Sequence, residues 1–391
     1  MKETLMIYDE NGYFNEFRAR VLSCRPAERG GYEVILSQTA FFPEQGGQVG
    51  DQGFLDGVRV RDTQIEDGLV IHYCEKPLAE GSVVHGAYDR DRRFDLMQNH
   101  TGEHILSGII CHSHSCNNVG FRLSEENCTV DYDCFLDEED LRKAELQANQ
   151  AIWADKQVIV DYPNDRELAR LDYRCKKELT GRIRIVTIPG IDVCACCAPH
   201  VSRTGEVGML KIISCEKHKS GVRLYIASGQ RAYRLMREIM EITDSLVHAL
   251  SLPKETLPQR SADMTAEIYR LTGQLSAVKI SLMKQQLQAA EGPLALFFVE
   301  DGLEKDVREV INEHLSHHEE SLCAGFTGND ASGYRCVMAS RNTDMKQLAE
   351  QLRQRLAFQG GGSRQMIQGS VRNSRQEIET VLNEMISQNG L

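Results

Sequence analysis

The sequence lacks several features that would assign it to a particular class of protein. Its longest apolar stretches, of which Leu294–Val299 is one, are far too short to cross a bilayer. The opening residues, Met1–Thr4, do not begin a basic and then apolar signal peptide. It contains no Walker signature and no Rossmann fingerprint, so no nucleotide cofactor is implied. These absences predict a cytoplasmic protein that has no membrane partner.

The chain also lacks an excess of positive charge. Its formal net charge is −12, which argues against nonspecific coating of nucleic acid, because neutralising phosphates requires clustered lysine and arginine. A local basic face remains open, and the alternative for each cluster is an ordinary solvated surface. The candidate clusters are Arg90, Arg92 and Arg93; Lys176, Lys177, Arg182 and Arg184; and Lys217, Lys219 and Arg223.

Cysteine, by contrast, is frequent. The chain has thirteen cysteines, an odd number that includes the run Cys194–Cys197. This pattern fits a reducing compartment better than a secreted disulfide framework, so we expect free thiols and no disulfide. A single cysteine is more often a small buried hydrophobe than a ligand, which is the alternative for Cys194 and Cys197.

Two short motifs have the spacing of a metal site. His100 and His104 lie four residues apart in a segment expected to be helical, so their side chains share one face. Cys196 and His200 have the same spacing in a second segment. Imidazole and thiolate donors suit zinc, whereas magnesium and calcium prefer oxygen. We predict that these four residues bind one Zn²⁺ per chain. The alternative for the histidine pair is a core or solvated helix face.

The chain length and the hydrophobic patterns predict an α+β protein of several domains. At 391 residues the chain exceeds the usual size of one core. Residues 1–88 alternate apolar and polar positions in short runs separated by glycine, which predicts a small β-barrel. Residues 89–228 combine a helix over 94–110, which carries the histidine pair, with strands and a helix over 137–154. This mixed α+β domain holds both halves of the proposed metal site.

The second half of the chain has a different pattern. Residues 229–291 carry apolar side chains at helical spacing on both sides of Pro253 and Pro258. We expect a long, coiled-coil-like helical hairpin that serves as a spacer or as a dimerisation arm. Residues 292–391 alternate strands and helices, which predicts a separate C-terminal α/β domain.

A glycine run within this last domain is a candidate substrate-binding element. Gly360, Gly361, Gly362 and the nearby Arg364 offer unshielded backbone amides beside a guanidinium, which can hold a phosphate or the edge of a nucleotide. A glycine run that follows a helix is also the ordinary signal that ends a helix. Both interpretations remain open.

Several motifs, taken in order, resemble the alanyl-tRNA editing proteins, which are freestanding relatives of the editing domain of alanyl-tRNA synthetase. These motifs are Thr39–Asp51, the pair His100 and His104, the pair Cys196 and His200, and Gly205–Ile213 with Gly221–Arg223. Gly360–Gly362 with Gln368 and Gly369 is similar to the glycine-rich element of the C-terminal domain that the synthetase shares with DHH-type phosphoesterases. The resemblance spans nearly the whole chain and matches the long form of the family. The family commonly has threonine where this chain has Pro199, which removes a hydroxyl and fixes the local backbone.

The resemblance implies hydrolysis of mischarged tRNA(Ala), chiefly seryl-tRNA(Ala) and also glycyl-tRNA(Ala), with alanyl-tRNA(Ala) spared. A pocket that accepts alanine cannot strongly reject serine or glycine, so a second site must remove the error. The resemblance makes residues 89–228 a zinc-dependent editing domain, with tRNA as its partner. It also makes Thr39 the group that recognises the serine hydroxyl, the alternative being an ordinary strand threonine beside a turn.

Further residues are predicted to act in catalysis or in substrate binding. Gly46 and Gly47 would let the backbone approach the terminal adenosine, with a tight hairpin turn as the alternative. Gln48 would orient water or the ribose. Glu103 is a candidate general base, although on a helix it points away from the histidine face and is expected at the surface. Arg93, from the first basic cluster, is a candidate substrate-binding residue.

The mechanism and two rival functions stay open at this point. Four protein ligands would make a closed structural site, so either one ligand is loose or the zinc expands its coordination. Zinc either activates the attacking water or only anchors the substrate. The run His100–His104 also matches the H-x-x-E-H pattern of inverted zinc peptidases, which would leave Cys196 and His200 idle. The other rival is a noncatalytic RNA-binding module with structural zinc. A homodimer through the helical arm or the C-terminal domain is a further expectation.

Overall fold

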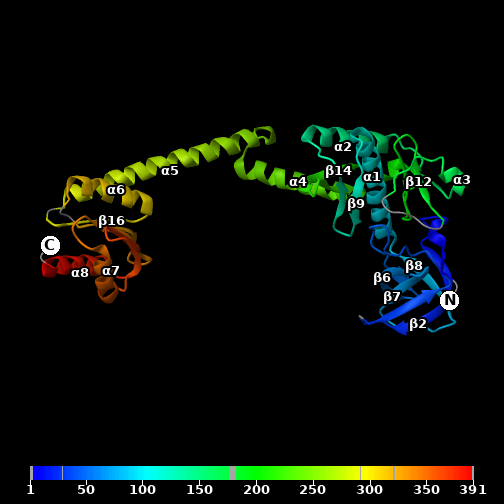
Figure 1. The fold of residues 1–391 in the computed structure, drawn as a ribbon, viewed down its shortest axis with the longest axis horizontal. Coiled ribbons are helices and arrows are strands. Elements are labelled where there is room, and N and C mark those ends of the chain that lie inside the picture. The colour runs from blue at the N-terminus through cyan, green and yellow to red at the C-terminus, as the bar shows by residue number, and fades with distance from the viewer. Residues whose placement is uncertain (1–2, 29, 176–181, 291, 320–321, 390–391) are drawn as a thin grey trace. The chain divides into compact units, whose positions relative to one another are not determined.

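The computed structural model describes residues 3–28, 30–175, 182–290, 292–319 and 322–389. Lys176 and Lys177, from the second predicted basic cluster, lie outside the described residues. The chain divides into two compact units, Met1–Leu246 and Val247–Leu391 (Figure 1). Helices and strands occur in both, so the predicted α+β class is confirmed. The finer division into four regions remains a prediction. Among the described residues, no helix is both long and apolar enough to cross a membrane.

The N-terminal part of the first unit is a closed barrel of six strands, which confirms the predicted β-barrel. Neighbouring strands are antiparallel. In the first strand Phe17, Ala19 and Val21 point into the barrel while the residues between them are exposed, as expected for a period of two. Around the barrel the order is β2 (Glu16–Pro26), β3 (Tyr32–Leu36), β7 (Leu69–Cys74), β6 (Val58–Glu66), β5 (Gly53–Leu55) and β8 (Val83–Tyr88).

Helix α1 (Arg90–His114) follows the barrel directly and passes through the middle of the first unit (Figure 1). The Asp89 side chain caps it by accepting a hydrogen bond from the backbone N–H of Arg92. The helix is longer than the predicted 94–110, and every residue from Leu96 to Gly108 is buried. A helix covered on all sides has no solvent face, so its polar side chains must find partners inside the protein.

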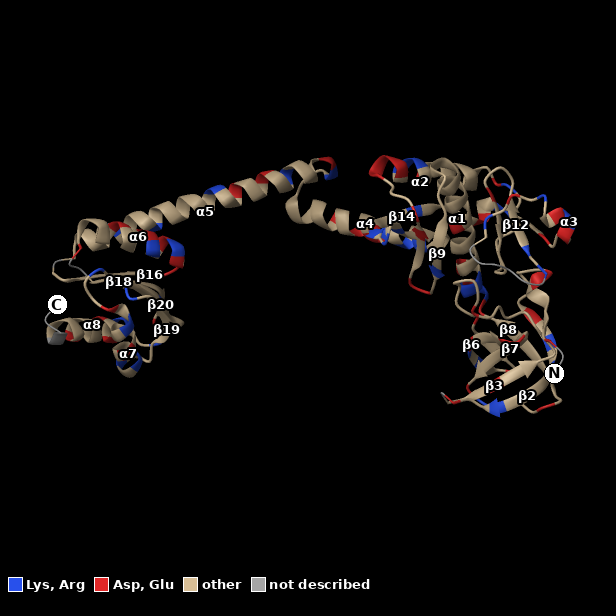
Figure 2. Cartoon of the chain, in the orientation of Figure 1, with Lys and Arg blue, Asp and Glu red and all other residues tan. Residues whose placement is uncertain are grey.

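Two sheets and a second helix surround α1. Helix α2 (Glu138–Trp153) begins with an acidic first turn, red in Figure 2, which suits the positive end of a helix dipole. One sheet has the order β14 (Leu210–His218), β15 (Gly221–Ser228), β10 (Cys128–Tyr132) and β9 (Asn118–Leu123). The other has the order β11 (Ile159–Asp161), β12 (Ile185–Ile188) and β13 (Asp192–Ala195). The chain leaves β13 directly into Cys196 and His200.

The helices expected over 229–291 are present. They are α4 (Gly229–Leu250), which begins in the first unit, and α5 (Leu257–Gln288) in the second, with the one-turn η3 (Lys254–Thr256) between them. Large apolar side chains of both helices are exposed, among them Ile239, Ile242, Leu246, Ile268, Leu271 and Leu275. The packing of α4 against α5 as a hairpin remains a prediction.

The second unit contains a five-stranded sheet with helices on both faces. The apolar side chains of α5 and α6 (Glu304–His317) pack on one face, and those of α7 (Met345–Leu356) and α8 (Arg375–Asn389) pack on the other. Only the first pair of strands is parallel. The order is β16 (Leu294–Val299), β17 (Leu322–Asn329), β18 (Gly333–Ser340), β20 (Met366–Val371) and β19 (Gln359–Gly362).

Candidate metal centre

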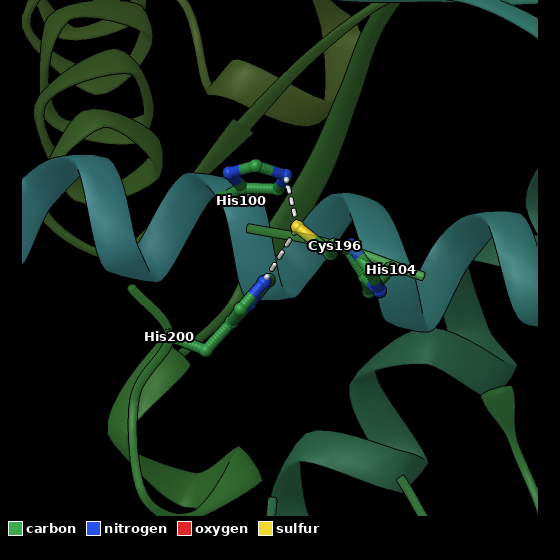
Figure 3. Close-up of side chains that lie close together, drawn as sticks. All are labelled: His100, His104, Cys196 and His200. Carbon is green, nitrogen blue, oxygen red and sulfur yellow. Dashed lines mark hydrogen bonds between the residues drawn. The ribbon is translucent and has the colours of Figure 1, made fainter. Parts of the chain in front are cut away.

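The four residues singled out by their spacing lie together in the first unit. Helix α1 brings His100 and His104 to one face, and the segment after β13 brings Cys196 and His200 against them (Figure 3). One potential ligand atom from each residue lies within 4.8 Å of those of the others. Both α1 histidines are 2% exposed and His200 is 6% exposed. The cluster therefore joins two chain segments almost a hundred residues apart, with its three histidines buried and Cys196 partly buried.

The distances in the cluster suit a tetrahedral ion. The Cys196 thiol sulphur lies 3.3 Å from Nε2 of His200 and 3.6 Å from Nε2 of His100. Zinc bonds of about 2.0–2.1 Å to nitrogen and about 2.3 Å to sulphur, meeting at the tetrahedral angle, separate the two donor atoms by about 3.5 Å. The donor set and its spacing fit zinc.

Each of the three histidine rings is held through its other nitrogen, Nδ1. This leaves Nε2 of every ring directed at the common centre, the arrangement that fixes the tautomer of metal-binding histidines. The three Nδ1 contacts are His100 to Gln48 Oε1 at 2.8 Å, His104 to Asp192 Oδ2 at 2.9 Å, and His200 to Thr101 Oγ1 at 3.0 Å.

Asp192 and Arg174 are functional candidates that the sequence patterns did not indicate. Asp192 is 5% exposed and receives two hydrogen bonds from the Arg174 guanidinium, at 2.7 and 2.8 Å, in addition to the one from His104. Burial alone would raise the pKa of Asp192, but these partners lower it to about 2. The same contact with Asp192 raises the pKa of His104 to about 9 against the effect of burial. Neither residue has a motif spacing to the ligands, so only the fold reveals them.

The electrostatics of the cluster favour the thiolate form of Cys196. Burial would raise the pKa of Cys196, but His100 and His200 outweigh it and hold the pKa well below its usual value. Burial lowers the pKa of His200 to about 3. Thiolate and neutral imidazole are the forms that bind a metal. Burial raises the pKa of Cys194, and it raises the pKa of Cys197 to about 12, so neither neighbour is activated in the same way.

The predicted glycine turn reaches the centre from the barrel. Gly46 has φ +62° and Gly47 φ +89°, values that L side chains rarely adopt. A Cβ on Gly47 would lie 2.4 Å from the carbonyl oxygen of Phe121. Backbone hydrogen bonds between this turn and Leu123 of β9 fix Gln48 beside His100. The glycines thus serve a tight turn and a close backbone approach.

Glu103 lies inside the protein, so its expected surface position is wrong. Its side chain is 0% exposed. Oε1 accepts hydrogen bonds from Ser107 (2.6 Å) and from Asn118, and Oε2 lies 4.0 Å from Nε2 of His104. The periodicity argument failed because α1 is also covered on the side that carries Glu103. Glu103 remains a candidate for the chemistry, now as a buried carboxylate.

Thr39 ends β4 (Gln38–Thr39), a two-residue strand paired with β1 (Leu5–Met6), and His72 of the barrel strand β7 determines the direction of its hydroxyl. Nδ1 of His72 donates to the Val34 carbonyl (3.1 Å), and burial lowers the pKa of His72 to about 4. Nε2 of this neutral ring therefore accepts the Thr39 hydroxyl proton at 2.8 Å, while the Phe41 N–H donates to the same oxygen. The two described hydrogen bonds of the Thr39 hydroxyl thus join it to His72 and to the backbone of Phe41.

Arg93 is buried at the junction between the barrel and α1. It is 1% exposed, forms an ion pair with Asp51, donates to the carbonyl oxygens of Gly12 (3.0 Å) and Ala40 (2.9 Å), and stacks over Tyr88. These contacts give it a structural role in joining the two parts. Its role in substrate binding remains a prediction.

The glycine run of the second unit is an extended edge strand, β19. A Cβ on Gly360 would lie 2.2 Å from the Gln368 carbonyl oxygen, whereas a Cβ on Gly361 would meet only Arg353, at 3.9 Å. Arg364 is 84% exposed in its side chain. Close pairing with β20 therefore explains Gly360, and Gly361 faces open space.

Two family models match parts of the chain. The model described as the threonyl and alanyl tRNA synthetase second additional domain matches residues 183–225, which include Cys196 and His200. The model described as tRNA synthetases class II (A) matches residues 14–92, which include the barrel.

Curated relatives match almost the full length of the chain. It is 27% identical over 409 residues to an alanine–tRNA ligase of Pyrococcus abyssi, covering 98% of this chain and 44% of the relative. It is 26% identical to the alanyl-tRNA editing protein AlaX-L of Pyrococcus horikoshii, covering 97% and 98%. It is 24% identical to the alanyl-tRNA editing protein Aarsd1 of Rattus norvegicus, covering 96% and 97%. The chain thus spans less than half of the ligase but nearly all of each editing protein. The resemblance predicted from the motifs is confirmed: from end to end the chain is similar to the long alanyl-tRNA editing proteins.

Proposed function

We propose that this chain is a trans-editing hydrolase that removes the wrong amino acid from tRNA(Ala). The observation that carries the proposal is the convergence of His100, His104, Cys196 and His200 on one point, with Gln48 of the barrel beside them. The similarity to proteins named alanyl-tRNA editing proteins over nearly their whole length supports the same activity.

Zinc is the proposed cofactor, one ion per chain. The mixed nitrogen and sulphur donors, the near-tetrahedral separations and the three held Nδ1 atoms support it. When bound, zinc would supply Lewis-acid polarisation or activate water for attack on the ester. The chain's own residues exclude bulk water, orient the rings and keep Cys196 in the thiolate form.

Serine is the proposed main substrate residue, with glycine as a second. An alanine-selecting site cannot reject either strongly, which is the physical need for a separate hydrolase. Thr39 is the proposed recognition group for the serine hydroxyl. Because its own proton is committed to His72, the Thr39 oxygen can take part only as a hydrogen-bond acceptor.

The remaining predicted residues are proposed to hold the tRNA. Gly46 and Gly47 would admit the terminal adenosine, Gln48 would orient water or the ribose, and Glu103 would act as a general base. We further propose that β19 with Arg364 contacts a phosphate, and that the exposed apolar residues of α4 and α5, or the C-terminal domain, support a homodimer.

A deacylation assay tests this function. Purified protein is mixed with seryl-, glycyl- and alanyl-tRNA(Ala), and the ester remaining is followed over time. We expect rapid loss of the seryl ester, loss of the glycyl ester and retention of the alanyl ester. No loss of the seryl ester above the level of a His104→Ala control would refute the proposal. Equal loss of the alanyl ester would remove its proofreading purpose.

The zinc peptidase alternative gains no support from the geometry. It leaves Cys196 and His200 without a role, yet both lie against the histidine pair. The Cys196→Ala variant separates the two functions. We expect it to lose zinc, and undiminished zinc content would favour the peptidase.

A further inference from the structure

The three histidines of the metal centre are supported unequally through Nδ1. His104 donates to Asp192, whose carboxylate is ionised and held by two hydrogen bonds from Arg174. A hydrogen bond to an ionised acceptor is roughly twice as strong as a neutral one. A stronger acceptor at Nδ1 also makes Nε2 a better electron donor to a metal. His104 therefore has the firmest support of the three.

The acceptors of the other two rings are neutral. His100 donates to the amide oxygen of Gln48 at 2.8 Å. His200 donates to the hydroxyl of Thr101 at 3.0 Å, and the same hydroxyl oxygen also accepts the Val201 N–H at 3.3 Å. A hydroxyl shared between two donors is the weakest acceptor of the set. The basicity of the ligands thus decreases from His104 through His100 to His200.

The backbone supports follow the same order. His100 and His104 lie one turn apart in the fully buried part of α1, where neither can move without the helix. His200 lies between β13 and the short η2 (Thr204–Val207), in a segment without regular secondary structure. Moving His200 therefore breaks no helical hydrogen bond, whereas moving the backbone of His100 or His104 disturbs α1.

We propose that His200 is the ligand that gives up its position when the substrate enters, and that Thr101 is the positioning residue that keeps this ligand weak. The inference rests on the metal centre proposed above. It addresses a conflict in the donor set, because four protein ligands make a closed structural site whereas a catalytic site needs one open position. Because His200 is held less firmly than the other histidines, the same four residues can form the closed site and the site with one open position.

Metal affinity provides the first test. Zn²⁺ affinity is measured by competition with a chromophoric chelator for the wild type, His200→Ala and His104→Ala, after circular dichroism has verified folding. We expect His200→Ala to weaken Zn²⁺ binding by less than about 10-fold and His104→Ala to weaken it by more than about 100-fold. These values lie on either side of the loss of about 10- to 100-fold that follows removal of a hydrogen-bond partner of a metal ligand. If His200→Ala loses as much Zn²⁺ affinity as His104→Ala, or more, the inference is overturned.

Strengthening the weak acceptor provides a second test, whose outcome cannot be mimicked by damage to the fold. In Thr101→Asp a carboxylate replaces the hydroxyl that accepts the hydrogen bond from Nδ1 of His200. We expect Zn²⁺ affinity to rise by about 10-fold while kcat for the seryl ester falls by a similar factor. Thr101→Ser keeps the hydroxyl and is the reference for affinity, so it should bind Zn²⁺ as the wild type does. A Thr101→Asp variant with lower affinity than Thr101→Ser contradicts the proposal.

The two tests separate this inference from the proposed function. Chelator competition needs no tRNA, so the order of affinities stands or falls whether or not the seryl ester is hydrolysed. If the seryl ester is hydrolysed but His200→Ala binds Zn²⁺ no better than His104→Ala, the editing function stands and the proposal for His200 is wrong.

Discussion

Two glycine runs in this chain look alike in the sequence and differ in the structure. Gly46 and Gly47 adopt positive φ in a tight turn that approaches another backbone at the metal centre. Gly360 and Gly362 have an extended backbone, and a larger residue would not fit there because β20 lies against them. The comparison teaches that a glycine run signals either an unusual backbone conformation or a close approach, and that only the fold distinguishes the two.

The largest effect is expected for Gly47→Ala. The new Cβ would meet the Phe121 carbonyl oxygen at 2.4 Å at a φ that already costs about 1–2 kcal/mol for an L residue. Because Gln48 follows directly, we expect deacylation to fall by about 100-fold and metal affinity by about 10-fold. Kinetics and chelator competition measure both. Gly30→Ala is the matched control, since Gly30 has φ +84° and no atom within 4 Å. Equal losses in the two variants would show that the approach to Phe121 is unimportant.

The next effect concerns the edge strand of the second unit. In Gly360→Ala the Cβ would lie 2.2 Å from a backbone carbonyl oxygen of β20, which cannot shift cheaply. We expect the free energy of unfolding of this unit to fall by about 2–3 kcal/mol, with the zinc content unchanged. Denaturant melts of the full chain and metal analysis measure the two quantities. Gly361→Ala, which faces open space, should cost less than about 0.5 kcal/mol. A reversed order would contradict the assignment of β19.

Low pH should reduce the stability that depends on the Asp192 carboxylate, whereas the packing of β19 does not depend on charge. Asp192 has a folded pKa of about 2, below the value of about 3.9 expected for the unfolded chain. A lowered pKa stabilises the fold above the unfolded value, and this stability is lost as the pH falls from about 4 to about 2. The shift corresponds to about 2–3 kcal/mol. Urea melts across this window should show that Asp192→Asn loses less stability than the wild type. Parallel curves would disprove the role of the Asp192 carboxylate.

The smallest effect is expected for Arg364→Ala. This side chain is 84% exposed, and its contact with Asp344 is 3.5 Å long, so its removal should leave stability within about 0.5 kcal/mol. If β19 contacts a tRNA phosphate, KM for the tRNA should rise about 2- to 5-fold with kcat unchanged, and the salt dependence of KM should weaken. An unchanged KM at low salt would remove the arginine from the proposed tRNA contact.

The parts of the fold that local patterns determine were predictable from sequence. Alternation in strands such as β2 indicated the barrel, and the spacing of His100 with His104 and of Cys196 with His200 pointed to the residues that meet. The strand over Gln359–Gly362 was harder to predict, because glycine has little strand preference.

Prediction from sequence fails where tertiary contacts decide the position of a side chain. Glu103 was expected at the surface because helical periodicity points it away from the histidine face, but α1 has no free side. Asp192, Arg174, Thr101 and His72 hold the proposed ligands or Thr39 from distant positions, and no spacing rule connects them. Hydrogen-bond partners of this kind follow from the packing of whole elements and leave no periodic signal.

The bridge between Gln48 and Leu123 has a consequence for how such a site can change over time. The four proposed metal ligands all come from residues 100–200, whereas the amide oxygen that accepts the hydrogen bond of His100 belongs to Gln48, in the turn between β4 and β5. Substitutions in this N-terminal part would therefore change the hydrogen bond to His100 without replacing any proposed ligand. The N-terminal part thus influences the proposed metal centre although it contributes none of the four ligands.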